Sequence, residues 1–125
     1  MHKSRLGNLV IDCDTDDLLA AAGFWSAALG YPLPDDVDAS GTFVQLVTPP
    51  GDVQVIVQRV VHDSRVHLDV ETDSIASEVA RLQGLSATVD SRHAGWIVMK
   101  APTGQRFCVG KPYRGNFDEG ANVWP

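Results

Sequence analysis

The sequence has little cysteine, and this argues against a small scaffold held together by several disulfides. Its two cysteines, Cys13 and Cys108, each lie in a strand-like apolar segment. A disulfide framework normally uses four or more cysteines at regular spacings. We therefore expect two buried free thiols in a reducing compartment, which indicates a cytoplasmic protein.

Long hydrophobic runs are also missing. The longest nearly apolar run, Leu18–Leu29, is interrupted by Ser26. It is shorter than the roughly 20 residues that a membrane-spanning helix needs. The first eight residues, MHKSRLGN, lack the apolar centre of a signal peptide. We expect neither a membrane partner nor export.

Positive charge is scarce in the first part of the chain. Residues 1–58 contain eight acidic and two basic residues, the remainder contains eight of each, and the net charge of the 125-residue chain is -6. Such a distribution repels phosphate backbones and anionic lipids, so nucleic acid is excluded as an expected partner. The length and the 44% apolar content suit one globular domain over residues 1–125.

What the sequence does contain is an internal repeat. The segment Asp12–Asp16 (DCDTD) is echoed by Asp69–Asp73 (DVETD). Each copy follows a strand-like run and precedes a segment with helical apolar period. The apolar positions are Leu18, Ala22, Trp25 and Leu29 in the first helix and Ile75, Val79 and Leu82 in the second. Acidic, Ser and Thr residues before each helix suit the N-cap, and Gly30 and Gly84 suit the helix ends.

Strand-like runs follow each helix. In the first half they cover residues 42–48 and 53–60, with a further short strand between Tyr31 and Asp38 that Pro32 and Pro34 weaken. In the second half they cover residues 87–92, 96–100 and 106–109. The sequence therefore predicts an α+β fold of two β-α-β-β-β units, at about 8–60 and 65–111, with a C-terminal tail over 112–125. Two such units facing each other would enclose a cup.

Strand period predicts which side chains face that cup, because successive residues of a strand point to opposite faces. Leu68 and Val70 should pack under the helix, which leaves His67 and Asp69 on the other face. By the same alternation, Phe107 and Val109 should pack inward. The expected ligand-binding residues are Val10, Gln54 and Gln58 in the first unit and His67, Asp69, Trp96, Arg106 and Cys108 in the second.

Several segments in order resemble one protein family. They are Asp12–Asp14 (DCD), Phe24–Tyr31 (FWSAALGY), Arg65–Val70 (RVHLDV), Trp96–Met99 (WIVM) and Ala101–Val109 (APTGQRFCV). From about residue 8 to 112 the chain resembles the glyoxalase-like domains of the glyoxalase/bleomycin resistance/dioxygenase group, the vicinal-oxygen-chelate superfamily. The resemblance implies paired β-α-β-β-β units in a curved, barrel-like mixed sheet with the helices outside. It also implies a homodimer.

The resemblance further implies where a metal ion would bind. Metal-using members take one ligand from the first strand and one from the last strand of each unit. These positions fall on His67 and Cys108 in the second unit, but on Val10 and the neighbourhood of Ile56 in the first, with Gln54 and Gln58 as the nearby polar residues. A catalytic zinc ion needs about three protein ligands. Two ligands are too few, so we expect neither a metal ion nor another cofactor.

Three functions remain open at this stage. The first is a binding protein that holds a small hydrophobic or aromatic molecule in the cup, as bleomycin-resistance-type members do. The second is a metal-free lyase or isomerase in which His67 acts as a general base, because imidazole titrates near neutral pH. The third is a metal-dependent lyase or dioxygenase. A fold of this kind carries many activities, so the fold alone does not choose among them.

Overall fold

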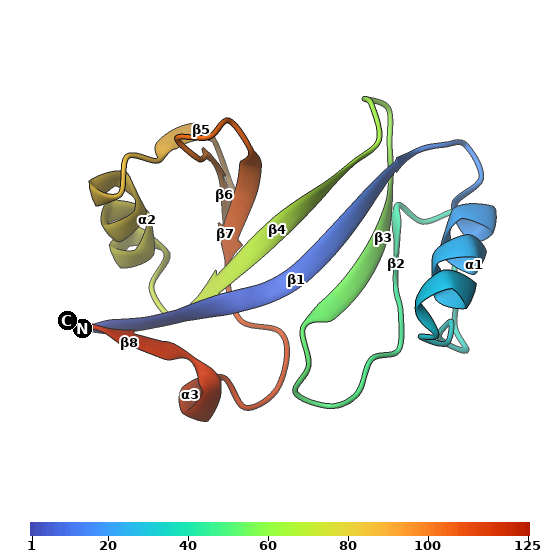
Figure 1. Ribbon diagram of the computed structural model, residues 1–125, viewed down its shortest axis with the longest axis horizontal. Helices are drawn as coiled ribbons and strands as arrows, with labels where there is room; N and C mark the ends of the chain where they lie inside the picture. Colours follow the sequence, from blue (N-terminus) through green and yellow to red (C-terminus); the bar gives the residue numbers. More distant parts are fainter. The chain divides into compact units, whose positions relative to one another are not determined.

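The computed structural model describes residues 1–125, which fold into two compact units. The N-terminal unit comprises Asn8–Val66, and the C-terminal unit comprises Met1–Gly7 together with His67–Pro125. Strand β1 (His2–Asp14) therefore begins in the C-terminal unit and ends in the N-terminal unit (Figure 1). None of the helices has the length and apolar content needed to cross a membrane.

The N-terminal unit is a three-stranded mixed sheet with one helix. Strand β3 (Gln54–Val60) lies between β1, with which it pairs in parallel, and β2 (Phe43–Gln45), with which it pairs antiparallel. Helix α1 (Leu18–Leu29) packs on β2 and β3 (Figure 1). Their shared core consists of Ile11, Leu18, Ala22, Val44, Leu46, Val55 and Val57.

Helix α1 begins and ends where the sequence predicts. The Asp17 carboxylate accepts a hydrogen bond from the Ala20 backbone N–H at 3.0 Å, which satisfies one of the free amides of the first turn. The helix ends at Gly30, whose φ of 77° is accessible to glycine at little cost. Leu29 is nevertheless exposed, because it is the last helical residue and lies beyond the turns that bury Leu18 and Ala22.

No strand forms between Tyr31 and Asp38, so the N-terminal unit is β-α-β-β. Pro32 and Pro34 have no backbone N–H to donate to a neighbouring strand. The Pro32 carbonyl accepts one hydrogen bond from the Val47 N–H at 2.8 Å. The segment instead packs side chains against the core, among them Leu33 and Val37.

The C-terminal unit has the predicted β-α-β-β-β order. It contains most of β4 (Arg65–Thr72), then α2 (Ile75–Gly84), β5 (Thr88–His93), β6 (Trp96–Lys100) and β7 (Arg106–Gly110). The strand order is β1-β4-β7-β6-β5, with β4 and β7 parallel and the β5-β6 and β6-β7 pairs antiparallel. The α+β fold with mixed strand pairing is therefore confirmed.

The core of the C-terminal unit lies between α2 and the sheet. It consists of Val79, Ala87, Ile97, Met99 and Val109, with Val70, Ile75, Leu82, Val89 and Phe107 packed against them. The prediction that Leu68 would also pack under the helix is wrong, since this side chain is 44% exposed. Strand β4 pairs with β7 only from Asp69 to Glu71, and Leu68 precedes that segment.

The C-terminal tail is an integral part of the C-terminal unit. It forms the short helix α3 (Phe117–Gly120) and strand β8 (Asn122–Trp124), which pairs antiparallel with the start of β1. The indole N–H of Trp124 donates to the Ser4 hydroxyl at 2.8 Å. The Arg5 guanidinium donates to the carbonyls of Arg114, Gly115 and Asn116 and to the Glu71 carboxylate. The tail is thus tied to both β1 and β4.

Candidate functional site

Three chemically active side chains meet on one face of the β4–β7 strand pair. His67 and Asp69 are two residues apart on β4, so their side chains share a face. Asp69 lies directly opposite Cys108 of β7 in the parallel register. His67 Nε2 is 3.4 Å from Asp69 Oδ1, and one donor atom from each of the three residues lies within 4.8 Å of the other two. We call these residues the His-Asp-Cys cluster.

The sheet positions this cluster because its opposite face is buried. Val70 and Phe107 pack against the core under α2, and Val109 belongs to that core. The alternate positions Asp69 and Cys108 therefore point away from it. The cluster is partly exposed: 12% of the His67 side chain and 26% of the Asp69 side chain are accessible, and Cys108 is half-buried. Each of the three side chains therefore keeps some contact with solvent.

Two further predicted site residues of the C-terminal unit are engaged in pairs. Arg106 Nε donates to Asp90 Oδ2 at 3.2 Å, and both side chains are partly exposed. Trp96 is 45% exposed and stacks on His93, with ring centroids 4.7 Å apart and an interplanar angle of 9°. The Trp96–His93 pair therefore presents a flat aromatic surface at the turn between β5 and β6.

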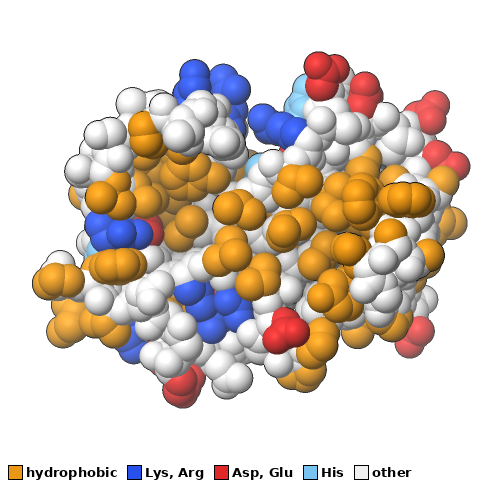
Figure 2. All heavy atoms as spheres, in the orientation of Figure 1, with side chains coloured by type: hydrophobic (Ala, Val, Ile, Leu, Met, Phe, Trp, Pro, Cys, Tyr) orange, Lys and Arg blue, Asp and Glu red, His pale blue; other side chains and the backbone are white.

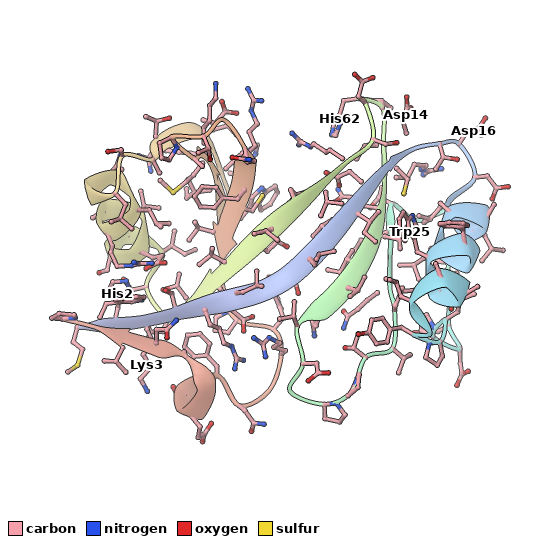
Figure 3. All side chains as sticks on the ribbon, viewed as in Figure 1. His2, Lys3, Asp14, Asp16, Trp25 and His62 are labelled. Atoms are coloured by element: carbon pink, nitrogen blue, oxygen red, sulfur yellow. The ribbon has the colours of Figure 1, made fainter.

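The predicted residues of the N-terminal unit lie on the face of β1 and β3 opposite α1. The register pairs are Asn8 with Gln54, Val10 with Ile56 and Asp12 with Gln58. Val10 is 2% exposed, whereas Gln54 and Gln58 are half-buried. Figure 3 shows the side chains of this unit in place, with Asp14, Asp16, Trp25 and His62 labelled.

The sequence analysis did not predict three features of the strand faces that carry the candidate site residues. The first is Asn8, which strand alternation places on the same face of β1 as Val10 and Asp12. The second is Arg65, whose Nε donates to Asp12 Oδ2 at 3.3 Å and for which no sequence signal exists. The third is Asp69 as a possible metal ligand, because the prediction counted only His67 and Cys108. The spacing of two residues between His67 and Asp69 was the available signal.

The two thiols have different surroundings. Cys13 packs against the core of the N-terminal unit, and its Sγ donates to the Ile11 carbonyl at 3.6 Å. Burial raises the pKa of Cys13 above its ordinary value, and the charge of Asp12 adds to this rise, while a hydrogen bond with Trp25 opposes it. Cys108 instead lies beside an imidazole and a carboxylate. Of the two thiols, Cys108 is the one that lies beside both an imidazole and a carboxylate.

The fold and the site define a class: an α+β protein with two strand-helix units that carries polar and titratable groups on strand faces opposite its helices. The family of glyoxalase-like domains matches residues 8–110, and the chain belongs to this family. No curated protein matches the chain.

Two solved structures are similar to it. A bleomycin-binding protein from bleomycin-producing Streptomyces verticillus, complexed with copper(II)-bleomycin, is 17% identical, with 87% of this chain and 98% of that chain covered and a TM-score of 0.35. TnmS3, an antibiotic binding protein from Streptomyces sp. CB03234, is 20% identical, with 83% and 93% covered and a TM-score of 0.32.

The side chains at the family's metal position can be compared with the ligands that a metal ion needs. In the C-terminal unit, His67, Asp69 and Cys108 offer one nitrogen, one oxygen and one sulfur atom within 4.8 Å of one another. This is the number of protein ligands that a catalytic zinc site uses, and the donor types suit a borderline-soft ion. Val10, at the position in the N-terminal unit equivalent to His67, offers no donor. The cluster therefore fits an ion held from one unit only.

Proposed function

We propose that the chain binds a small hydrophobic or aromatic molecule on the strand face that carries the His-Asp-Cys cluster. The observation that supports this proposal is the partial exposure of His67, Asp69 and Cys108. These residues lie on one face of the sheet, and the opposite face packs against the core. Binding sites combine apolar surface with a few convergent polar groups. Here the cluster supplies the polar groups, and the Trp96–His93 pair supplies a flat aromatic surface.

A screen of aromatic acids and aromatic amines, read by ligand-observed NMR in the presence of a chelator, tests this proposal. His67→Ala and Trp96→Ala should each weaken the binding of a hit by at least about tenfold, the loss expected when one central contact is removed. Glu119→Ala, at an exposed position of α3 in the same unit, is the control and should leave the affinity unchanged. Hits that bind all variants equally would contradict the proposed site.

A metal-free lyase or isomerase is the second candidate, and the His67–Asp69 pair favours it. A carboxylate 3.4 Å from an imidazole can orient the ring. His67 would then remove a proton from a bound molecule. With a ligand in hand, exchange of its acidic C–H for deuterium in D₂O measures this step directly. His67→Gln should abolish exchange while binding persists, and exchange at the wild-type rate would exclude His67 as the base.

A metal-dependent reaction is the third candidate, favoured by the three donors of the cluster. A bound ion would supply Lewis-acid polarisation of a ligand oxygen. Elemental analysis of protein purified without chelators tests this. Stoichiometric zinc, iron or manganese that is lost in both Asp69→Asn and Cys108→Ser would support it. Metal that is absent from the wild type, or retained by both variants, would contradict a site at the cluster.

A further inference from the structure

Helix α1 carries two apolar stripes, of which one is buried. The buried stripe packs into the core of the N-terminal unit and consists of Leu18, Ala22 and Trp25. The second stripe is exposed and consists of Ala20, Phe24, Ala27 and Ala28. Its i, i+4, i+7, i+8 spacing places these four side chains on one side of the helix. We call this stripe the outer face of α1.

The outer face differs from the solvent-facing side of an ordinary surface helix, which is polar. Residues Leu18–Leu29 include no charged side chain. Phe24 is 63% exposed, and Leu19 at the margin of the stripe is 45% exposed. Helix α2, by contrast, exposes no large hydrophobic side chain. A helix that is apolar on all sides is normally covered, so the outer face of α1 is an interaction surface without its partner.

The charge around the outer face has one sign. Residues 6–58 contain eight acidic residues and no Lys, Arg or His. Four exposed acidic residues flank the helix, two before it and two after it: Asp16, Asp17, Asp35 and Asp36. Figure 3 shows Asp16 at the N-terminal end of α1, and Figure 2 shows acidic side chains along the outer edge of this unit. The complementary partner therefore combines apolar groups with positive charge.

We propose that the outer face of α1 binds a cationic amphipathic helix of another protein. The apolar side of that helix covers Phe24 and the alanines, and its Lys and Arg side chains lie near the acidic residues that flank α1. The small alanine side chains let the two helices approach closely, while Phe24 projects between side chains of the partner. This interaction is separate from the binding of a small molecule in the C-terminal unit.

Charge favours this occupant over a second copy of the chain and over a lipid surface. The N-terminal unit contains nine acidic and two basic residues, so its net charge is -7, and two outer faces brought together repel each other. Anionic phospholipid repels the unit for the same reason. A basic helix is instead attracted by these charges, and the attraction weakens as salt is added.

The test uses the full chain and three labelled synthetic peptides of about 14 residues, a length that gives about four helical turns. The first has Leu on one helical side and Lys on the other. The second has Glu in place of every Lys, and the third has the composition of the first in an order that gives no apolar side. Fluorescence anisotropy measures binding in about 20 mM NaCl. The Leu-Lys peptide should bind at least about tenfold more tightly than the other two, each of which lacks half of the complementarity.

Substitution of Phe24 locates the binding surface. Phe24→Ser should weaken binding of the Leu-Lys peptide by about tenfold or more, because the largest apolar contact is lost. The exposed position of Phe24 lets the variant fold. Leu85→Ser, which removes a side chain of similar exposure (60%) from the C-terminal unit, is the matched control and should leave the affinity unchanged.

Neutralising the flanking acidic residues tests the charge contribution. The double variant Asp16→Asn/Asp35→Asn should weaken binding by about threefold and reduce its dependence on salt between about 20 mM and about 300 mM NaCl. Asp118→Asn/Glu119→Gln removes two negative charges from the C-terminal unit. This control should change neither the affinity nor the salt dependence.

Several results would overturn the proposal. They are no binding of the Leu-Lys peptide, equal binding of the three peptides, and equal binding to wild type and Phe24→Ser. A wild-type dimer in sedimentation velocity that Phe24→Ser converts to a monomer would assign the outer face to a second copy and would also overturn it. Phe24→Ser should bind the small-molecule hits as wild type does, so failure of this proposal and failure of the proposed function are distinguishable.

Discussion

At the scale of single residues, the most consequential group outside the site is Glu78. Its side chain is fully buried, and Oε1 lies 2.8 Å from His2 Nε2. Arg81 donates to both carboxylate oxygens at 2.8 Å, and its guanidinium lies 3.8 Å from the Trp124 ring centroid. The network joins β1, α2 and β8. Glu78 therefore helps to hold β1, α2 and β8 together through non-covalent contacts.

The hydrogen-bond partners of Glu78 stabilise the charged form of its carboxyl group. Burial alone would raise the pKa of this carboxyl group. Hydrogen bonds from Arg81, His2 and Ser4 and the charge of Arg81 outweigh burial and lower the pKa below its ordinary value of 4.5. As the pH falls, the unfolded chain therefore takes up a proton at Glu78 before the folded chain does. The contribution of Glu78 to stability is complete above about pH 4.5 and is lost at lower pH.

Glu78→Gln should lower the free energy of unfolding by about 2–3 kcal/mol at pH 7, because it leaves the Arg81 charge without its partner. Urea unfolding between pH 3 and pH 7 measures the difference from wild type. This difference should shrink as the pH falls below about 4.5. Glu119→Gln, at an exposed position of α3, is the control and should change stability little. A difference that is constant across the pH range would contradict the mechanism.

At the scale of elements, each unit has one helix with a side-chain N-cap. Asp17 caps α1 in the N-terminal unit, and Ser74 caps α2 through a 3.3 Å hydrogen bond from the Ser77 N–H. The sequence predicted both caps because short polar residues stand directly before the apolar period. Local signals of this kind need no tertiary information.

Asp17→Ala should destabilise the N-terminal unit by about 1 kcal/mol through loss of the cap. Amide hydrogen exchange, read separately for each unit, measures where the loss occurs. Protection in α1 should fall, whereas protection in α2 should stay the same; Ser74→Ala should show the reverse pattern. Asp16→Ala, at the exposed neighbouring position, controls for the charge. An equal effect of Asp16→Ala would show that charge, and not the cap, is responsible.

At the scale of the whole molecule, charge divides unequally between the two units. The N-terminal unit contains nine acidic and two basic residues, which makes its net charge -7, and the C-terminal unit sums to +1. Figure 2 shows acidic side chains along the outer edge of the N-terminal unit, around the hydrophobic side chains near α1. Like charges on one small unit repel each other and weaken its folded state.

Salt should therefore stabilise the N-terminal unit more than the C-terminal unit. Raising NaCl from about 20 mM to about 300 mM shortens the screening length and should strengthen protection in the N-terminal unit by up to about 1 kcal/mol. Protection in the C-terminal unit should change much less. Amide exchange at the two salt concentrations is the measurement, and equal gains in both units would show an effect unrelated to their charge.

Homodimerisation and a cytoplasmic location stay predictions. Sedimentation velocity measures whether the chain forms a homodimer.

Much of this molecule was predictable because the relevant signals are local. Strand alternation placed Val70 and Val109 in the core and turned Asp69 and Cys108 away from it, and helical period placed Ile75, Val79 and Leu82 correctly. The failures came where an element ends or where two segments meet. Leu29 and Leu68 have the right period but lie outside the packed part of their elements.

The sequence by itself determined the β-α-β-β-β order of the C-terminal unit, the N-caps of α1 and α2, and the faces that side chains share. These depend on spacings of two to four residues along one segment. Only the tertiary structure decided that Cys108 joins His67 and Asp69, that Arg65 meets Asp12, and that the tail pairs with β1. Each of those contacts depends on how distant segments align, and the period of a segment does not encode its alignment with another.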